Sequence, residues 1–103
     1  MIPQLRVWHE RYEGAGLTIV GVHSPEFLWE RAHDRVVAAV RELGIRYPVV
    51  QDNDFAIWKR FNTWAWPTGV LVDRRGVIRY THIGEGAYAD SEVMIRRLLD
   101  EPG

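Results

Sequence analysis

The sequence predicts an α/β fold with a mixed β-sheet, formed by a single domain over residues 1–103. Three observations support this prediction. Residues 17–22 carry apolar side chains on both faces, which is typical of a buried parallel strand. Helical patterns precede and follow this strand, so that helices and strands alternate. A hairpin pattern over residues 66–83 then adds two antiparallel strands. The expected order is α-β-α-β-α-β-β-α.

The first predicted helix begins with the chain itself, whereas an α/β domain usually opens with a strand. Pro3 suits a first helical turn, and Gly14 and Gly16 end the helix. Its apolar residues recur at helical spacing: Ile2, Leu5, Trp8 and Tyr12.

A second helix is expected to start at Ser24, where a hydroxyl cap precedes Pro25 and the acidic Glu26. It should end at Gly44. One face of this helix carries its apolar residues: Val36, Val40 and Leu43.

A short strand over residues 47–51 follows, at the edge of the sheet because it contains Pro48. Asp52 and Asn53 then cap a third helix. The inner face of that helix is predicted to be aromatic: Phe55, Trp58 and Phe61.

Pro67 has no N–H group and therefore fits the first residue of a strand. The residues alone leave the isomer of the Trp66–Pro67 bond open. Gly76 supplies the positive φ that the hairpin turn requires. Asp90 or Ser91 caps a last helix, which buries four residues: Met94, Ile95, Leu98 and Leu99.

Composition excludes several classes of function. The 13 basic and 14 acidic residues leave a net charge of −1, with no bulk attraction to nucleic acid or anionic membrane. No apolar run approaches the roughly 20 residues that span a bilayer. The start lacks the pattern of a signal peptide, so the chain as it stands is expected to be cytoplasmic. The absence of cysteine excludes thiol catalysis within the chain.

Two motifs suggest ligands but have simpler interpretations. The pattern G-x-G-x-x-A at residues 84–89 resembles a dinucleotide fingerprint, yet no parallel strand and no acidic residue follow at the required spacing. Residues 52–54 open like a calcium loop, but Ile57 stands where the loop needs glycine. The four histidines lack metal-ligand spacing, so we predict no cofactor and no metal.

His23 follows a predicted parallel strand at its carboxyl end, where the sites of α/β proteins cluster. With Glu26 it forms a candidate proton-handling pair, and the alternative is a structural histidine in the loop. Ser24 has no adjacent base and is interpreted as a cap rather than a nucleophile.

Taken in order, several segments resemble the thioredoxin superfamily, in particular its TlpA-type and DipZ-type redoxin (AhpC/TSA-like) domains. The resemblance covers essentially the whole chain and rests on these parts: Pro3, residues 8–12, 21–27, 47–49, 52–53 and 66–68, Asp73, Gly76 and residues 84–86. It implies a three-layer α/β/α fold and an ancestry in thiol–disulfide exchange. It also implies that Pro67 is the cis-proline of the family.

The chain departs from this family at its start. The resemblance places the Cys-x-x-Cys motif and the first, central strand upstream of Met1, so the domain is expected to be truncated and inactive in disulfide exchange. The missing strand would lie between residues 17–22 and 68–73. We expect these strands to pair directly or a partner chain to cover them, most simply in a homodimer.

The resemblance further implies a surface for an extended peptide or a protein thiol partner, formed by four residues: Trp64, Trp66, Pro67 and Thr68. The alternative is that both tryptophans are core side chains. A second hypothesis for the function is accordingly a non-catalytic peptide- or protein-binding module that uses this surface.

Overall fold

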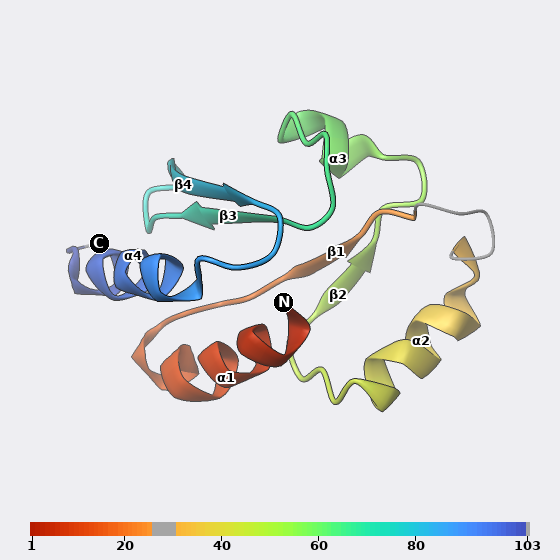
Figure 1. Cartoon of the computed structure of the whole chain (residues 1–103), viewed down its shortest axis with the longest axis horizontal. Coiled ribbons are helices and arrows are strands. Elements are labelled where there is room, and N and C mark those ends of the chain that lie inside the picture. The colour runs from red at the N-terminus through yellow and green to blue at the C-terminus, as the bar shows by residue number, and fades with distance from the viewer. Residues whose placement is uncertain (26–30, 103) are drawn as a thin grey trace.

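The computed structural model describes residues 1–25 and 31–102. Figure 1 shows the order of the elements along the chain. The helices are α1 (Ile2–Tyr12), the 3₁₀ turn η1 (Glu13–Ala15), α2 (His33–Glu42), α3 (Ala56–Arg60) and α4 (Tyr88–Asp100). The strands are β1 (Gly21–His23), β2 (Val49–Gln51), β3 (Thr68–Val72) and β4 (Ile78–Ile83).

The strands form two separate pairs rather than one continuous sheet. β1 pairs with β2 in parallel, and β3 pairs with β4 in antiparallel fashion. The arrows of β1 and β3 point in opposite directions in Figure 1. Because β1 and β3 belong to different pairs, the expectation that they pair directly is wrong, whereas the alternative, that a partner chain covers them, stays a prediction. Each of them uses only one edge for pairing within residues 1–25 and 31–102.

The strand expected over residues 17–22 is shorter than its sequence suggests. Its pairing with β2 begins only at Gly21, which lies opposite Val49. The preceding residues have the apolar pattern of a strand but no neighbouring strand in the described structure to bond with. Leu17 and Ile19 still pack against the core, whereas Val20 and Val22 are 52% and 44% exposed, so the prediction of a strand buried on both faces is wrong.

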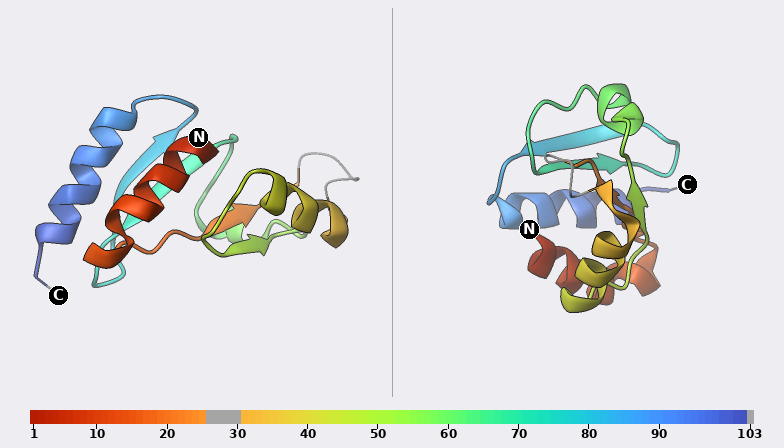
Figure 2. Two further views of the ribbon diagram at one scale, coloured as in Figure 1. Left: turned by 90° about the horizontal axis from the view of Figure 1, so that it is seen from below. Right: turned by 90° about the vertical axis from the view of Figure 1, so that its right-hand side faces the viewer.

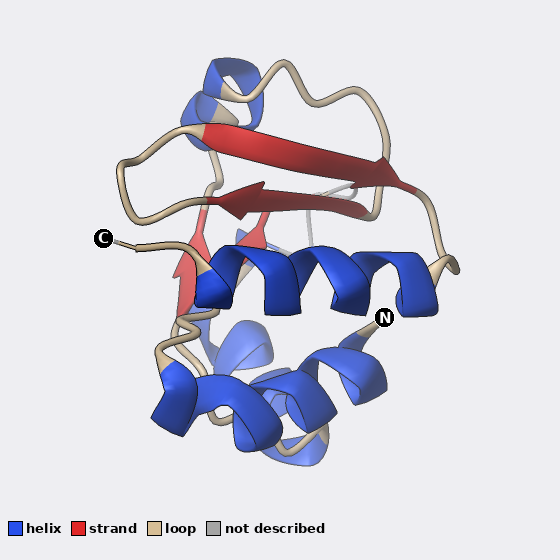
Figure 3. Cartoon of the chain, turned by 90° about the vertical axis from the view of Figure 1, so that its left-hand side faces the viewer, coloured by secondary structure: helices blue, strands red, loops and turns tan. Residues whose placement is uncertain are grey.

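The core lies where α1, α4 and β3 meet. Trp8 and Ile95 are 5% and 3% exposed, and Tyr12 is buried beside them. Leu71 of β3 packs against this cluster. Figure 3 shows α4 lying between the hairpin and α1. The first and last predicted helices are confirmed, although α4 begins at Tyr88, before either of its predicted caps.

A carboxylate joins the two helices that enclose the core. Glu92 of α4 accepts hydrogen bonds from Trp8 Nε1 at 2.7 Å and from the Tyr12 hydroxyl at 3.1 Å. The guanidinium groups of Arg11 and Arg96 each lie 2.9 Å from the same carboxylate. Donation by Trp8, then by Tyr12, together with the two arginines, lowers the pKa of Glu92.

The second helix differs most from its prediction. It begins at His33 rather than at the predicted start, because Ser24 and Pro25 are not helical; Glu26, which follows them, lies outside the described residues. Ser24 is not a helix cap, because its hydroxyl donates to Asp52. No residue of α2 is buried, and Leu43 is 44% exposed.

The helices lie on both sides of the strands, as the fold class requires. Figure 1 shows α1 and α2 on one side of the β1–β2 pair and α3 on the other, and the right-hand view of Figure 2 separates the same two groups. Within the described part of the chain, no single helix has both the length and the apolar character that a membrane span requires.

Candidate functional site

The segment that leads into β3 is held in a defined bend. The Trp66–Pro67 peptide bond is cis. The carbonyl oxygen of Pro67 accepts a hydrogen bond from the amide of Gly84 at 2.8 Å, and the Thr68 hydroxyl donates to the carbonyl of Ala65 at 2.7 Å. The bend is therefore fixed by two hydrogen bonds, one to Gly84 directly after β4 and one within the local turn at Ala65.

Two indole rings lie at the surface of this bend. Trp64 is 72% exposed and Trp66 is 48% exposed, so neither belongs to the core. The centroid of the Trp66 ring lies 4.3 Å from that of Trp58, with a 42° angle between the ring planes. The bend therefore presents a partly stacked aromatic surface beside the first residue of β3.

A buried carboxylate is linked to the Trp66 ring through Ser24. Trp66 Nε1 donates to the carbonyl oxygen of Ser24 at 2.8 Å. The hydroxyl of Ser24 in turn donates to Asp52 Oδ2 at 2.9 Å, and both residues are buried. Ser24 follows β1 directly, so this chain of bonds connects the end of β1 to the bend before β3.

Asp52 caps α3 through its side chain, as predicted, although Phe55 occupies the N-cap position and Asn53, the other predicted cap, donates to the carbonyl of Arg31 instead. The Asp52 oxygens accept hydrogen bonds from the amides of Ile57 at 3.0 Å and Trp58 at 2.9 Å. Burial by itself raises the pKa of a carboxyl group. Here the donors from Ile57, Trp58 and Ser24 outweigh burial and lower the pKa of Asp52, which holds it in the charged form.

The candidate proton-handling pair is only half described. His23 ends β1, and its Nδ1 is buried without a hydrogen-bond partner within the described residues. Glu26 lies outside the described residues, so the pair stays a prediction.

The two candidate ligand motifs have structural roles. Gly84 and Gly86 have φ values of +91° and +99° and form the connection from β4 to α4. β4 is the antiparallel arm of a hairpin, unlike the parallel strand of a dinucleotide-binding unit. Among residues 1–25 and 31–102, His, Asp and Glu side chains do not form a group of three or more that could hold a metal ion.

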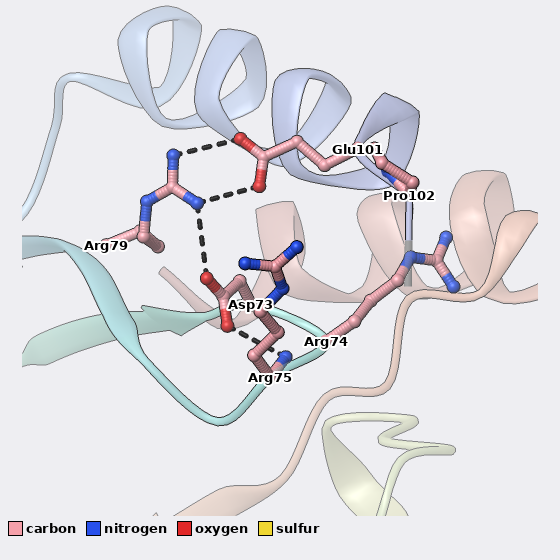
Figure 4. A pocket seen from close by; sticks show the side chains of 6 residues that line it. All are labelled: Asp73, Arg74, Arg75, Arg79, Glu101 and Pro102. Carbon is pink, nitrogen blue, oxygen red and sulfur yellow. Dashed lines mark hydrogen bonds and ion pairs between the residues drawn. The ribbon is translucent and has the colours of Figure 1, made fainter.

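A small polar cavity of about 160 Å³ lies between the hairpin turn and the end of α4. Figure 4 shows the Arg79 guanidinium between two carboxylates, 3.1 Å from Asp73 and 2.7 Å from Glu101. The Val77 amide and then Arg79 lower the pKa of Asp73. Arg74 donates to the carbonyl of Leu99 at 3.1 Å. These arginines hold the hairpin against α4, so the cavity is interpreted as structural.

Comparison with known proteins relates this geometry to established folds. No family model matches the chain. Protein DipZ of Mycobacterium tuberculosis is 36% identical over 100 residues, which cover 97% of this chain and 14% of DipZ. NHL repeat-containing protein 2 of Homo sapiens is 36% identical over 87 residues, which cover 84% of this chain and 12% of that protein. The chain thus spans only a small part of these relatives.

The solved structures agree over almost the whole chain. A thiol-disulfide isomerase from Corynebacterium glutamicum superposes with a TM-score of 0.88 at 23% identity, covering 98% of this chain and 70% of that one. StoA from Bacillus subtilis superposes with a TM-score of 0.71 at 19% identity, covering 91% and 69%. The fold is thioredoxin-like.

The chain matches only part of each of these solved structures. The chain covers about two thirds of the solved structures that it matches, and its 103 residues contain no cysteine. The thioredoxin-like fold is confirmed, and the chain itself contains no thiol.

Sequence analysis identified the tryptophans of the thioredoxin-like bend but missed what holds them. The link from Asp52 through Ser24 to Trp66 joins residues 28 and 42 positions apart. The only signal in the sequence was an acidic residue directly after a strand, and capping of α3 accounts for it equally well.

Proposed function

We propose that this chain forms the peptide-binding side of a thioredoxin-like thiol–disulfide exchange domain. The observation that carries the proposal is the exposure of two indoles, Trp64 and Trp66, directly beside the start of β3. Tryptophan offers a large contact area with few rotatable bonds, and it is enriched among residues that dominate binding energy. Exposed indoles at a tied-down bend are therefore a candidate contact surface.

The backbone supports the same interpretation. β3 pairs with β4 along one edge, and in the described part of the chain no strand pairs with the other edge. An extended peptide can add to an open edge through main-chain hydrogen bonds, while side-chain pockets supply selectivity. The resemblance places the central strand of the complete domain along this edge of β3, so the peptide is proposed to pair only with the backbone of the bend before β3, beside the two exposed indoles.

The chemistry of exchange has to come from elsewhere. The nucleophile in thiol–disulfide exchange is a thiolate, and this chain contains no cysteine. In the proposal these 103 residues bind and orient the substrate, and a thiolate outside them attacks the disulfide. The second candidate function is a binding module without exchange chemistry, which the same two features support: exposed indoles and no thiol.

Two measurements test these proposals. The first is the fluorescence anisotropy of a labelled short peptide that alternates threonine and valine. Replacement of a central interface tryptophan typically costs at least about 2 kcal/mol, so Trp66→Ala should weaken binding about 30-fold. Val93→Ala is the matched control, because Val93 is an exposed apolar residue on α4, away from the bend. Equal affinities of the wild type and Trp66→Ala would refute the surface.

The second measurement is the rate of insulin disulfide reduction by the 103-residue chain, which should not exceed the rate in buffer alone. Turnover above that rate would show that a group other than a thiol of this chain drives exchange. The same assay can be repeated after a segment with a Cys-x-x-Cys motif is added before Met1. Peptide binding without disulfide reduction by that longer chain would favour the binding module.

A further inference from the structure

We infer that Asp52 is a positioning residue for the proposed peptide-binding surface, and that it acts through Ser24 on the indole of Trp66. The inference rests on the proposed function for its biological meaning. Its structural part, that Asp52 fixes the orientation of the ring, can be tested without any peptide.

The bonds form a continuous path from a buried charge to an exposed ring. Asp52 is 3% exposed and Ser24 is 8% exposed, so neither readily exchanges its partner for water. Ser24 donates its hydroxyl to Asp52 Oδ2 and offers its carbonyl to Trp66 Nε1. A shift of Ser24 therefore moves the acceptor of the only N–H group on the Trp66 side chain.

Asp52 is also linked to the aromatic neighbour of the Trp66 ring. It caps α3 through the amides of Ile57 and Trp58, and the Trp58 ring lies against the Trp66 ring at a centroid distance of 4.3 Å. The Asp52 carboxylate is thus bonded to two residues that contact Trp66: Ser24, whose carbonyl accepts from the indole N–H group, and Trp58, whose ring lies beside the indole. The amide of Asp52 also donates to the carbonyl of His23 at 2.8 Å, which anchors the carboxylate to the end of β1.

This arrangement is more than a helix cap. Asp54 lies on the same turn and accepts a hydrogen bond from the amide of Ala56 at 3.2 Å, so it too stabilises the start of α3. Asp54 is exposed, and within residues 1–25 and 31–102 its side chain is not hydrogen-bonded to Ser24 or Trp66. The comparison of these two carboxylates separates the capping of α3 from the positioning of the ring.

The experiment measures hydrogen–deuterium exchange of the indole N–H groups by NMR, together with peptide affinity. Ser24→Ala deletes the bond to Asp52 and leaves the carbonyl acceptor in place. We expect exchange at Trp66 to accelerate about 5-fold, in line with the loss of about 1 kcal/mol of restraint. The alternating threonine–valine peptide should bind about 5-fold more weakly. Asp52→Asn should act in the same direction, and Asp54→Asn should change neither quantity.

The Trp8 indole is an internal reference, because it donates to Glu92 in the core and not to this network. Acceleration at Trp66 but not at Trp8 in Ser24→Ala supports the inference, while equal acceleration at both reports general loosening and overturns it. Unchanged exchange at Trp66 also overturns it. Faster exchange with unchanged peptide affinity overturns the role in binding. If the wild-type chain fails to bind the peptide, the proposed function is refuted, and the exchange data still decide whether Asp52 fixes the ring.

Discussion

The Tyr12 hydroxyl tests how the two helices around the core are held together. It donates to Glu92 at 3.1 Å and accepts from Arg96 Nε at 2.8 Å, so it bridges α1 and α4. Tyr12→Phe removes this one oxygen and leaves the buried ring in place. The change therefore isolates the polar contribution from the hydrophobic one.

The magnitude follows from what remains after the deletion. A hydrogen bond to a charged group contributes roughly 1.5–3 kcal/mol to stability. The loss of two such bonds, with no replacement, is therefore the upper limit for the effect of Tyr12→Phe. The Arg96 side chain is 62% exposed and can bind water instead. Glu92 keeps its donors from Trp8, Arg11 and Arg96. We therefore expect Tyr12→Phe to lower the free energy of unfolding by about 1.5–2 kcal/mol, near the lower end of the range for a single such bond.

Equilibrium unfolding in urea, followed by tryptophan fluorescence, measures this loss. In a chain of this length each 1 kcal/mol should lower the melting temperature by roughly 4–8 °C. Tyr80→Phe is the matched control, because the Tyr80 hydroxyl lies 3.4 Å from Ser91 Oγ, too far for a strong bond. Equal losses in the two variants would refute the assigned role of the bridge between α1 and α4.

Two further predictions concern pH and the hairpin turn. The folded-state pKa values of Asp52, Asp73 and Glu92 are lowered, so their contribution to stability is present above the unfolded pKa of about 4 and is lost as the pH falls through the folded values. The melting temperature should therefore decline below about pH 4, and a rise there would contradict the assignment. Gly76 has a φ of +83° in open space, so Gly76→Ala should cost about 1–2 kcal/mol in urea unfolding through backbone strain alone. Gly69→Ala also meets no atom within 4 Å but has no positive φ, and a comparable loss in that variant would exclude strain as the cause.

Local patterns predicted most of the helices and the hairpin. The spacing of Trp8 and Tyr12 correctly indicated α1 and its buried face, and Gly76 marked the hairpin turn. These features depend on neighbours in sequence, which the chain itself specifies. The predicted strand over residues 17–22 failed over its first four residues, because a strand also needs a neighbour in space.

The candidate site divides in the same way. The bend around Pro67 and the capping role of Asp52 could be predicted, since a strand start and a helix cap are local features. The exposure of Trp64 and Trp66 could not, because period and composition do not say which face of a bend the core covers.

The sequence by itself determined the α/β class, the order of the elements, the resemblance to redoxins and the absence of a thiol. Only the tertiary structure decided that the strands form two separate pairs and that Asp52, Ser24 and Trp66 belong to one network. The physical reason is that hydrogen bonds between distant segments depend on how helices and strands pack, and the hydrophobic pattern of a single segment does not contain that information.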